Sequence, residues 1–100
     1  MVAMTDTATT LADQVAGEIH RRIAAAVPGA AIEVVNDSHL HAGHAGDDGS
    51  GVTHWTVHVT SADFAGLSRV ERQRRINHAL AELMNAPIHA LAIKAKAPGE

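Results

Sequence analysis

One strictly alternating segment limits the possible folds more than any other feature of the chain. From residue 54 to residue 60, polar and apolar side chains alternate. A period of two places the two kinds on opposite faces of a half-buried β-strand. The apolar face carries Trp55, Val57 and Val59, and the polar face carries His54, Thr56, His58 and Thr60. The sequence therefore predicts a sheet with one face on a core and one face toward solvent, with His54 and His58 exposed.

A first amphipathic helix precedes this strand. Thr10 offers a hydroxyl N-cap, with an acid three residues later at Asp13. Pro28-Gly29 ends the helix, since proline has no N–H to donate and glycine accepts the backbone geometry of a helix end. The apolar residues recur at every fourth position, at Leu11, Val15, Ile19, Ile23 and Val27.

A second helix follows the strand. Phe64 lies in a short turn or single helical turn and is the obvious plug for the core. Ser68 and Glu71 form a capping box, which predicts a helix that continues to about Met84. At 100 degrees per residue one arc of this helix faces the sheet, and it contains Val70, Ile76, Leu80, Leu83 and Met84.

Two shorter strands complete the predicted sheet, over residues 32–35 and 88–93. In the last strand, alternation puts His89 on the same face as Leu91 and Ile93, which we expect to be the core face. An imidazole held where a strand enters the sheet, at the mouth of an apolar layer, is suited to be a rigid metal ligand. A structural histidine at the edge of the core is the alternative.

The segment between the first two strands concentrates three histidines in six residues, His39, His41 and His44, among glycine and alanine. Imidazoles at i, i+2 and i+5 on a glycine-rich loop can converge on one metal ion. The alternative is a solvated polar loop whose histidines have no role. We expect a loose zinc site at most in the isolated chain, because a glycine-rich segment offers no supporting hydrogen bonds.

Composition excludes several classes of function. The chain has 100 residues, enough for one domain, which we expect over residues 10–95 with flexible tails at 1–9 and 96–100. A formal charge of -3 gives no general attraction to nucleic acid. The chain has no cysteine, so any iron–sulfur cluster would need a partner's thiols. It also shows no signal peptide and no apolar run of membrane-spanning length, which predicts a cytoplasmic protein.

Three motifs, with the order helix, strand, strand, short helix, long helix, strand, resemble the BolA family over nearly all of residues 10–95. The first reads Val34-Val35-Asn36-Asp37-Ser38-His39-x-His41, followed by Thr53-His54-Trp55 where the family usually has Thr/Ser-His-Phe. The second reads Phe64-x-Gly66-x-Ser68-Arg69-Val70-x-Arg72-Gln73-Arg74-x-Ile76-Asn77. The third reads His89-Ala90-Leu91-Ala92-Ile93 and resembles the family's near-invariant His-Ala-Leu ending. The three motifs in this order are specific.

The sequence departs from the family pattern at two positions. Gln73 stands where a histidine is common between two arginines, so any role of that histidine is in doubt here. Trp55 stands where the family usually has phenylalanine.

The resemblance implies an α+β fold similar to class II KH domains, αββααβ, with a three-stranded sheet packed on helices. It also implies a heterodimer with a monothiol glutaredoxin of the CGFS type, in which the two chains share a bridging 2Fe-2S cluster. The glutaredoxin would supply its active-site cysteine and a bound glutathione thiol. This chain would supply His89 and one histidine of the loop, His39, His41 or His44, for iron–sulfur cluster trafficking or iron regulation.

Two other functions stay open at the level of sequence. Some BolA relatives resemble transcription regulators, and Arg69, Arg72, Arg74 and Arg75 could contact DNA weakly. Against this, KH recognition uses a GxxG loop, and residues 64–68 contain one glycine. A zinc protein or hydrolase built on the loop histidines is the third interpretation. No positioned base or nucleophile accompanies them, so we expect no enzyme and, for the isolated chain, a colourless monomer without a cluster.

Overall fold

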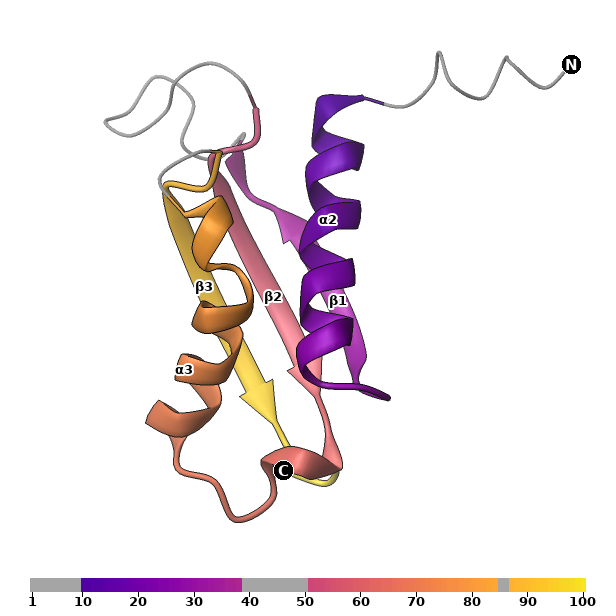
Figure 1. Ribbon diagram of the computed structural model, residues 1–100, viewed down its shortest axis with the longest axis vertical. Helices are drawn as coiled ribbons and strands as arrows, with labels where there is room; N and C mark the ends of the chain where they lie inside the picture. Colours follow the sequence, from indigo (N-terminus) through magenta and orange to yellow (C-terminus); the bar gives the residue numbers. More distant parts are fainter. Residues whose placement is uncertain (1–9, 39–50, 85–86) are drawn as a thin grey trace, which may run out of the picture.

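The structure, a computed structural model, describes residues 10–38, 51–84 and 87–100. The elements are α2 (Leu11–Ala26), β1 (Ala31–Asn36), β2 (His54–Thr60), the 3-10 turn η2 (Ala62–Phe64), α3 (Arg69–Ala79), the 3-10 turn η3 (Ala81–Leu83) and β3 (Ala90–Lys96). The sheet has the order β1-β2-β3, with β1 antiparallel and β3 parallel to β2 (Figure 1). The predicted α+β class is confirmed. Neither α-helix of the described ranges is long and apolar enough to cross a membrane.

The predicted start of α2 is confirmed in detail. The Thr10 hydroxyl accepts the Asp13 N–H at 3.1 Å, and the Asp13 carboxylate accepts the Thr10 N–H at 3.3 Å. This capping box satisfies two N–H groups that a helix start leaves without partners. Beyond the other end of the helix, Gly29 has a φ of 82°, a backbone conformation that residues with a side chain rarely adopt. Of the five periodic apolar residues only Leu11, at 53% exposed, is outside the core.

The prediction that the second helix runs to Met84 is wrong. α3 ends at Ala79, where the N–H of Leu80 is shared between the carbonyls of Ile76 (3.1 Å) and Asn77 (3.2 Å), and the chain tightens into η3. Val70, predicted on the buried arc, is 57% exposed. The core is reached by Ile76 and Leu80, so only the later half of α3 packs tightly on the sheet.

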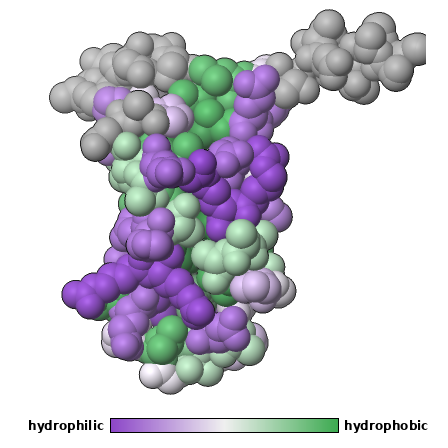
Figure 2. Space-filling view, viewed as in Figure 1, coloured by the Kyte–Doolittle hydropathy of each residue, from purple (hydrophilic) through white to green (hydrophobic). Residues whose placement is uncertain are grey.

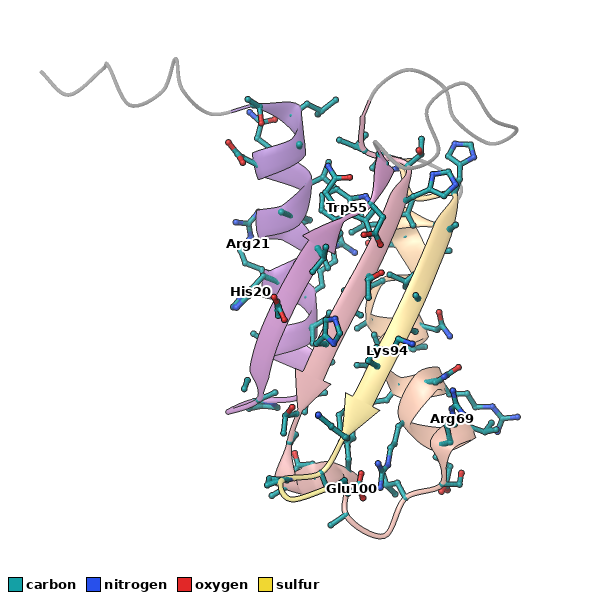
Figure 3. The ribbon with its side chains drawn as sticks, turned by 180° about the vertical axis from the view of Figure 1, so that it is seen from behind. His20, Arg21, Trp55, Arg69, Lys94 and Glu100 are labelled. Atoms are coloured by element: carbon teal, nitrogen blue, oxygen red, sulfur yellow. The ribbon has the colours of Figure 1, made fainter. Side chains whose placement is uncertain are left out.

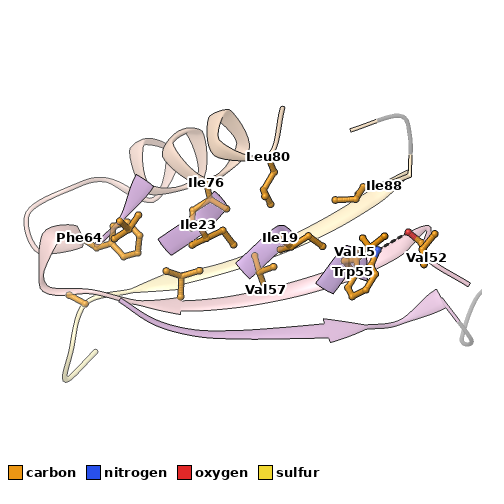
Figure 4. Packing of buried hydrophobic residues seen from close by; sticks show 13 residues of the cluster. Val15, Ile19, Ile23, Val52, Trp55, Val57, Phe64, Ile76, Leu80 and Ile88 are labelled. Atoms are coloured by element: carbon orange, nitrogen blue, oxygen red, sulfur yellow. Dashed lines mark hydrogen bonds between the residues drawn. The ribbon is translucent and has the colours of Figure 1, made fainter. Parts of the chain in front are cut away.

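Both helices cover the same face of the sheet, and the core lies between them and the strands (Figure 4). Strand register puts Val34, Val57 and Ile93 side by side on that face. The Trp55 indole is buried and donates its N–H to the Val52 carbonyl at 2.7 Å. The buried apolar residues of the described chain are Val15, Ile19, Ile23, Val27, Val52, Trp55, Val57, Val59, Phe64, Ile76, Leu80, Ile88 and Ala97.

The opposite face of the sheet, here called the open face, carries the other set of alternating side chains. In register across it lie Glu33 of β1, His58 of β2 and Lys94 of β3, all exposed. The prediction that His58 faces solvent is confirmed. No helix of the described chain covers this face (Figure 3).

The last strand is shifted from its predicted range of 88–93. Ile88 is fully buried and forms an isolated bridge with Met84, and β3 begins only at Ala90. β3 ends at Lys96, one residue beyond the domain boundary expected from the sequence. Ala97 is buried, and its carbonyl accepts the N–H of Glu100 at 3.1 Å, so the described C-terminal residues turn back toward the sheet.

Candidate functional site

Three strand termini meet at one end of the sheet, here called the loop end. β1 is antiparallel and β3 parallel to β2, so the last residue of β1 lies at the same end of the sheet as the first residues of β2 and β3, with β2 between the other two strands. The described chain therefore breaks off after Ser38 and resumes at Gly51 at this end of the sheet, where β3 also begins. His39, His41 and His44 themselves lie outside the described residues.

The Thr53 carbonyl fixes the backbone at the entry to β3. It accepts two N–H groups, from His89 at 2.8 Å and from Ala90 at 3.1 Å. Thr53 is fully buried, so water does not compete for these bonds. The backbone of residue 89 is thus fixed by hydrogen bonds at the start of the β2–β3 pairing, although residue 89 lies just outside β3.

The prediction that His89 faces the core is wrong, because its side chain is exposed. Two consecutive N–H groups on one carbonyl are incompatible with a regular ladder, in which successive residues point to opposite sides. The alternation that places Leu91 and Ile93 toward the helices therefore does not extend back to residue 89. Ile88 takes the buried position instead.

The prediction that His54 is exposed is also wrong, because this residue is only 9% exposed. Its strand position is on the open face as expected, and the chain continues to pair with its backbone after β1 ends. The Asp37 N–H donates to the His54 carbonyl at 2.8 Å, and the His54 N–H donates to the Ser38 hydroxyl at 3.1 Å. The His54 ring shares a hydrogen bond of 2.8 Å between Nδ1 and the Thr53 hydroxyl.

Asn36 closes the base of the segment 39–50. Its amide donates to the Gly51 carbonyl at 2.8 Å and its side-chain oxygen accepts the Ser38 N–H at 2.9 Å. The Asp37 carboxylate accepts a short hydrogen bond from the Thr56 hydroxyl on the open face. Sequence analysis did not single out Asn36, Ser38 or Thr53 as part of a site. Their signal was the run of Asn, Asp and Ser after a strand, since such side chains bond to nearby backbone groups.

A shallow cavity of about 230 Å³ on the open face adjoins the loop end. Small side chains line part of it, because Ala90 and Ala92 of β3 pair with His54 and Thr56 of β2. Among the described residues no three His, Asp or Glu side chains come close enough together to hold a metal ion.

The four arginines predicted as possible DNA contacts lie on α3, away from His89. Arg69, Arg74 and Arg75 are exposed, and hydrophilic side chains gather over this helix (Figure 2). Arg69 lies toward the opposite end of the sheet from Trp55 of the loop end (Figure 3). Arg72 differs from the other three, because its side chain is only 12% exposed and bound to Glu100. The structure thus does not bring His89 and the four arginines into one site.

Comparison with known proteins shows which family this chain resembles. Residues 23–100 match the BolA family, described as BolA-like protein. The chain is 37% identical to BolA-like protein 1 of Mus musculus over 89 residues, which is 89% of this chain and 62% of that protein. It is 36% identical over 69 residues to the DNA-binding transcriptional regulator BolA of Haemophilus influenzae, covering 69% of this chain and 63% of that one. The chain thus spans less than two thirds of both relatives.

A solved structure agrees with these matches. BolA1 from Arabidopsis thaliana superposes with a TM-score of 0.72 at 32% identity, over 83% of this chain and 90% of that one. The predicted resemblance is confirmed in its order of elements and in its extent along the sequence. The chain belongs to the BolA family.

Proposed function

We propose that this chain is an adaptor that pairs with a monothiol glutaredoxin and shares a bridging 2Fe-2S cluster with it. Such a pair would act in iron–sulfur cluster trafficking or iron regulation. This chain would supply His89 and one of the histidines at 39, 41 and 44, and the partner would supply a cysteine and a glutathione thiol. Membership of the BolA family supports the proposal. The observation that carries it is an exposed imidazole on a backbone position that the buried Thr53 carbonyl holds with two hydrogen bonds.

The donor chemistry of the loop end fits such a group. A neutral imidazole nitrogen binds iron of borderline softness, and this chain has no thiolate to compete with it. When bound, a cluster with mixed sulfur and imidazole ligands supplies a redox centre of higher potential than one with thiolates alone. His89 starts from a fixed backbone, and Asn36 joins the two ends of the segment that carries the other histidines. The chain's own contribution would therefore be His89 on its fixed backbone and one histidine of the segment that Asn36 closes.

The test mixes the purified chain with a cluster-loaded monothiol glutaredoxin and glutathione. We expect a heterodimer by size-exclusion chromatography and changed visible absorption and circular dichroism spectra, while the chain alone stays colourless. A failure to form any complex, with unchanged spectra, would contradict the proposal.

Single-histidine variants identify the ligands. His89→Ala should abolish the spectrum of the bridged pair, and His41→Ala should weaken or shift it, because His39 or His44 can take its place. His20→Ala on α2, an exposed histidine far from the loop end, is the matched control and should leave the spectrum unchanged (Figure 3). If His89→Ala leaves the bridged spectrum intact while His41→Ala erases it, His89 is structural.

DNA binding is the second candidate, favoured by the name of the Haemophilus influenzae relative and by the arginines exposed on α3. Arg72 is bound to Glu100, which leaves Arg69, Arg74 and Arg75 free to contact phosphate. With a salt slope of about -0.9 per phosphate contact, log affinity should fall against log salt with a slope no steeper than about -3. A sequence-specific complex that survives physiological salt would favour this function over the first.

A further inference from the structure

A groove lined by four cationic residues lies between the first half of α3 and β3. Its volume is about 420 Å³. The lining residues are the apolar Leu67, Ile93 and Ala95 and the polar Arg69, Arg72, Gln73, Lys94 and Lys96, of which Lys94 and Lys96 belong to the open-face positions of β3 and border the groove from that outer strand. Four of these eight side chains are cations and none is an acid. We call this feature the α3–β3 groove.

One carboxylate is already held beside the groove. The Arg72 guanidinium donates from Nη1 and Nη2 to the two carboxylate oxygens of Glu100, at 2.5 and 2.8 Å. The backbone N–H of Ala97 donates to the same carboxylate at 2.9 Å. Arg72 lowers the pKa of Glu100 from 4.5 to about 2, and the Ala97 N–H adds to the effect. Three N–H donors around one carboxylate make a preformed binding site for an acidic group.

The guanidinium would keep its orientation without Glu100. Its Nε donates to the Leu67 carbonyl at 3.1 Å, and the guanidinium carbon lies 6.0 Å from the centre of the buried Phe64 ring. Cations over an aromatic face are attracted to it. A carboxylate from another chain would therefore meet the same geometry that Glu100 meets now.

The other three cations of the α3–β3 groove form no direct ion pair. Within the described chain no salt bridge involves Arg69, Lys94 or Lys96, and all three are exposed, although the charge of Lys96 also helps to lower the pKa of Glu100. Arg69 and Glu100 lie toward the same end of the molecule (Figure 3). The groove thus combines a carboxylate site, three cations without a direct ion pair in the described chain, and three apolar lining residues.

We propose that the α3–β3 groove docks an acidic segment of a partner protein, and that Glu100 is an intramolecular competitor for the Arg72 subsite. The occupant already seated there is a carboxylate, and the lining residues Leu67, Ile93 and Ala95 suit the apolar side chains of a peptide. Nucleic acid fits less well, because Arg74 and Arg75 do not line the groove. Its lining does not include His89, and the docking proposal is independent of the proposed cluster.

The test measures fluorescence anisotropy of a labelled oligo-glutamate peptide against the full chain. Glu100→Gln should tighten binding by about threefold to tenfold, because the competing carboxylate is gone while the side-chain shape stays. Replacing Arg69, Lys94 and Lys96 together by glutamine should weaken binding about tenfold. Replacing Arg21, Arg74 and Arg75 together removes the same charge outside the groove and should change affinity by less than about twofold.

Three results would overturn the proposal. The first is unchanged affinity in Glu100→Gln when circular dichroism shows an intact fold. The second is equal weakening in both triple variants, which would mean attraction by overall charge alone. The third is a labelled oligothymidine that binds more tightly than oligo-glutamate and loses affinity in the groove triple variant, which would make nucleic acid the occupant. None of these measurements uses a cluster, so their failure is separate from failure of the adaptor proposal.

Discussion

The two ends of the sheet are held together by different kinds of interaction. At the loop end most ties are neutral hydrogen bonds, in which the N–H groups of His89 and Ala90 donate to the Thr53 carbonyl and the His54 N–H donates to the Ser38 hydroxyl, beside one bond from Thr56 to the Asp37 carboxylate. At the end with the α3–β3 groove, the tie is the ion pair of Arg72 and Glu100. Neutral buried bonds change little with salt or moderate pH, whereas an exposed ion pair is screened and titrates. The first arrangement suits a fixed ligand position, and the second suits an exchangeable contact.

The largest expected effect tests whether the two ends unfold together. Phe64 is fully buried at the groove end, so Phe64→Ala should lower the free energy of unfolding by about 3–5 kcal/mol. Trp55, the only tryptophan, reports on the loop end by fluorescence during urea unfolding. Because one core joins the two ends, the fluorescence and far-UV circular dichroism transitions should move by the same amount. A Trp55 transition that stays in place would mean that the ends unfold separately.

A smaller effect sharpens the account of the loop end. Thr53→Val keeps the carbonyl that holds His89 but removes the hydroxyl that bonds to His54 Nδ1. We expect a loss of about 1–2 kcal/mol in urea unfolding, equal at low and high salt. Thr60→Val, whose hydroxyl makes no hydrogen bond within the described chain, is the control and should stay within about 0.5 kcal/mol. A loss that depends on salt would contradict the view that neutral bonds hold this end.

The two capping boxes compare the ends with matched chemistry. The hydroxyl of Ser68 accepts the Glu71 N–H at 3.1 Å, the same distance as from Thr10 to the Asp13 N–H. Ser68→Ala and Thr10→Ala should each cost about 1 kcal/mol by thermal or urea unfolding. If one variant unfolds like the wild type, the hydroxyl cap of that helix contributes nothing to the free energy of unfolding.

The smallest effect is the titration of the groove end. The folded-state pKa of Glu100 is about 2, below its ordinary 4.5, because of the Arg72 hydrogen bonds. A depressed carboxyl pKa stabilises the folded state above the ordinary value, and this contribution is lost as pH falls from about 4.5 toward 2. Carbon-detected NMR of the Glu100 carboxyl should show a midpoint near 2, which Arg72→Lys raises. A wild-type midpoint near 4.5 would show that the ion pair does not form in solution.

The fold was predictable because its signals are local. The caps at Thr10 and Ser68 and the alternation over β2 depend on residues within a few positions of one another. They correctly gave the order of elements and the open face. The end of α3 was misplaced because a helix and a 3-10 turn share nearly the same apolar spacing up to residue 84.

The candidate sites were less predictable because their contacts are distant in the sequence. His89 was placed on the wrong face because its direction depends on the Thr53 carbonyl, which belongs to another strand. Arg72 was named as a phosphate contact, but its carboxylate partner is 28 residues away. No local pattern indicates either contact. Only the folded structure shows that the His89 side chain is exposed and that Glu100 binds Arg72.

Lys94 and Lys96 also affect how the chain meets copies of itself. β3 is an outer strand of the sheet, and such strands expose backbone groups that can pair with the same strand of another molecule. Two β3 edges approaching each other would bring four lysines together. The resulting repulsion keeps the molecules apart as they accumulate, so the charges that would attract an acidic segment also protect the protein from aggregation at its own edge.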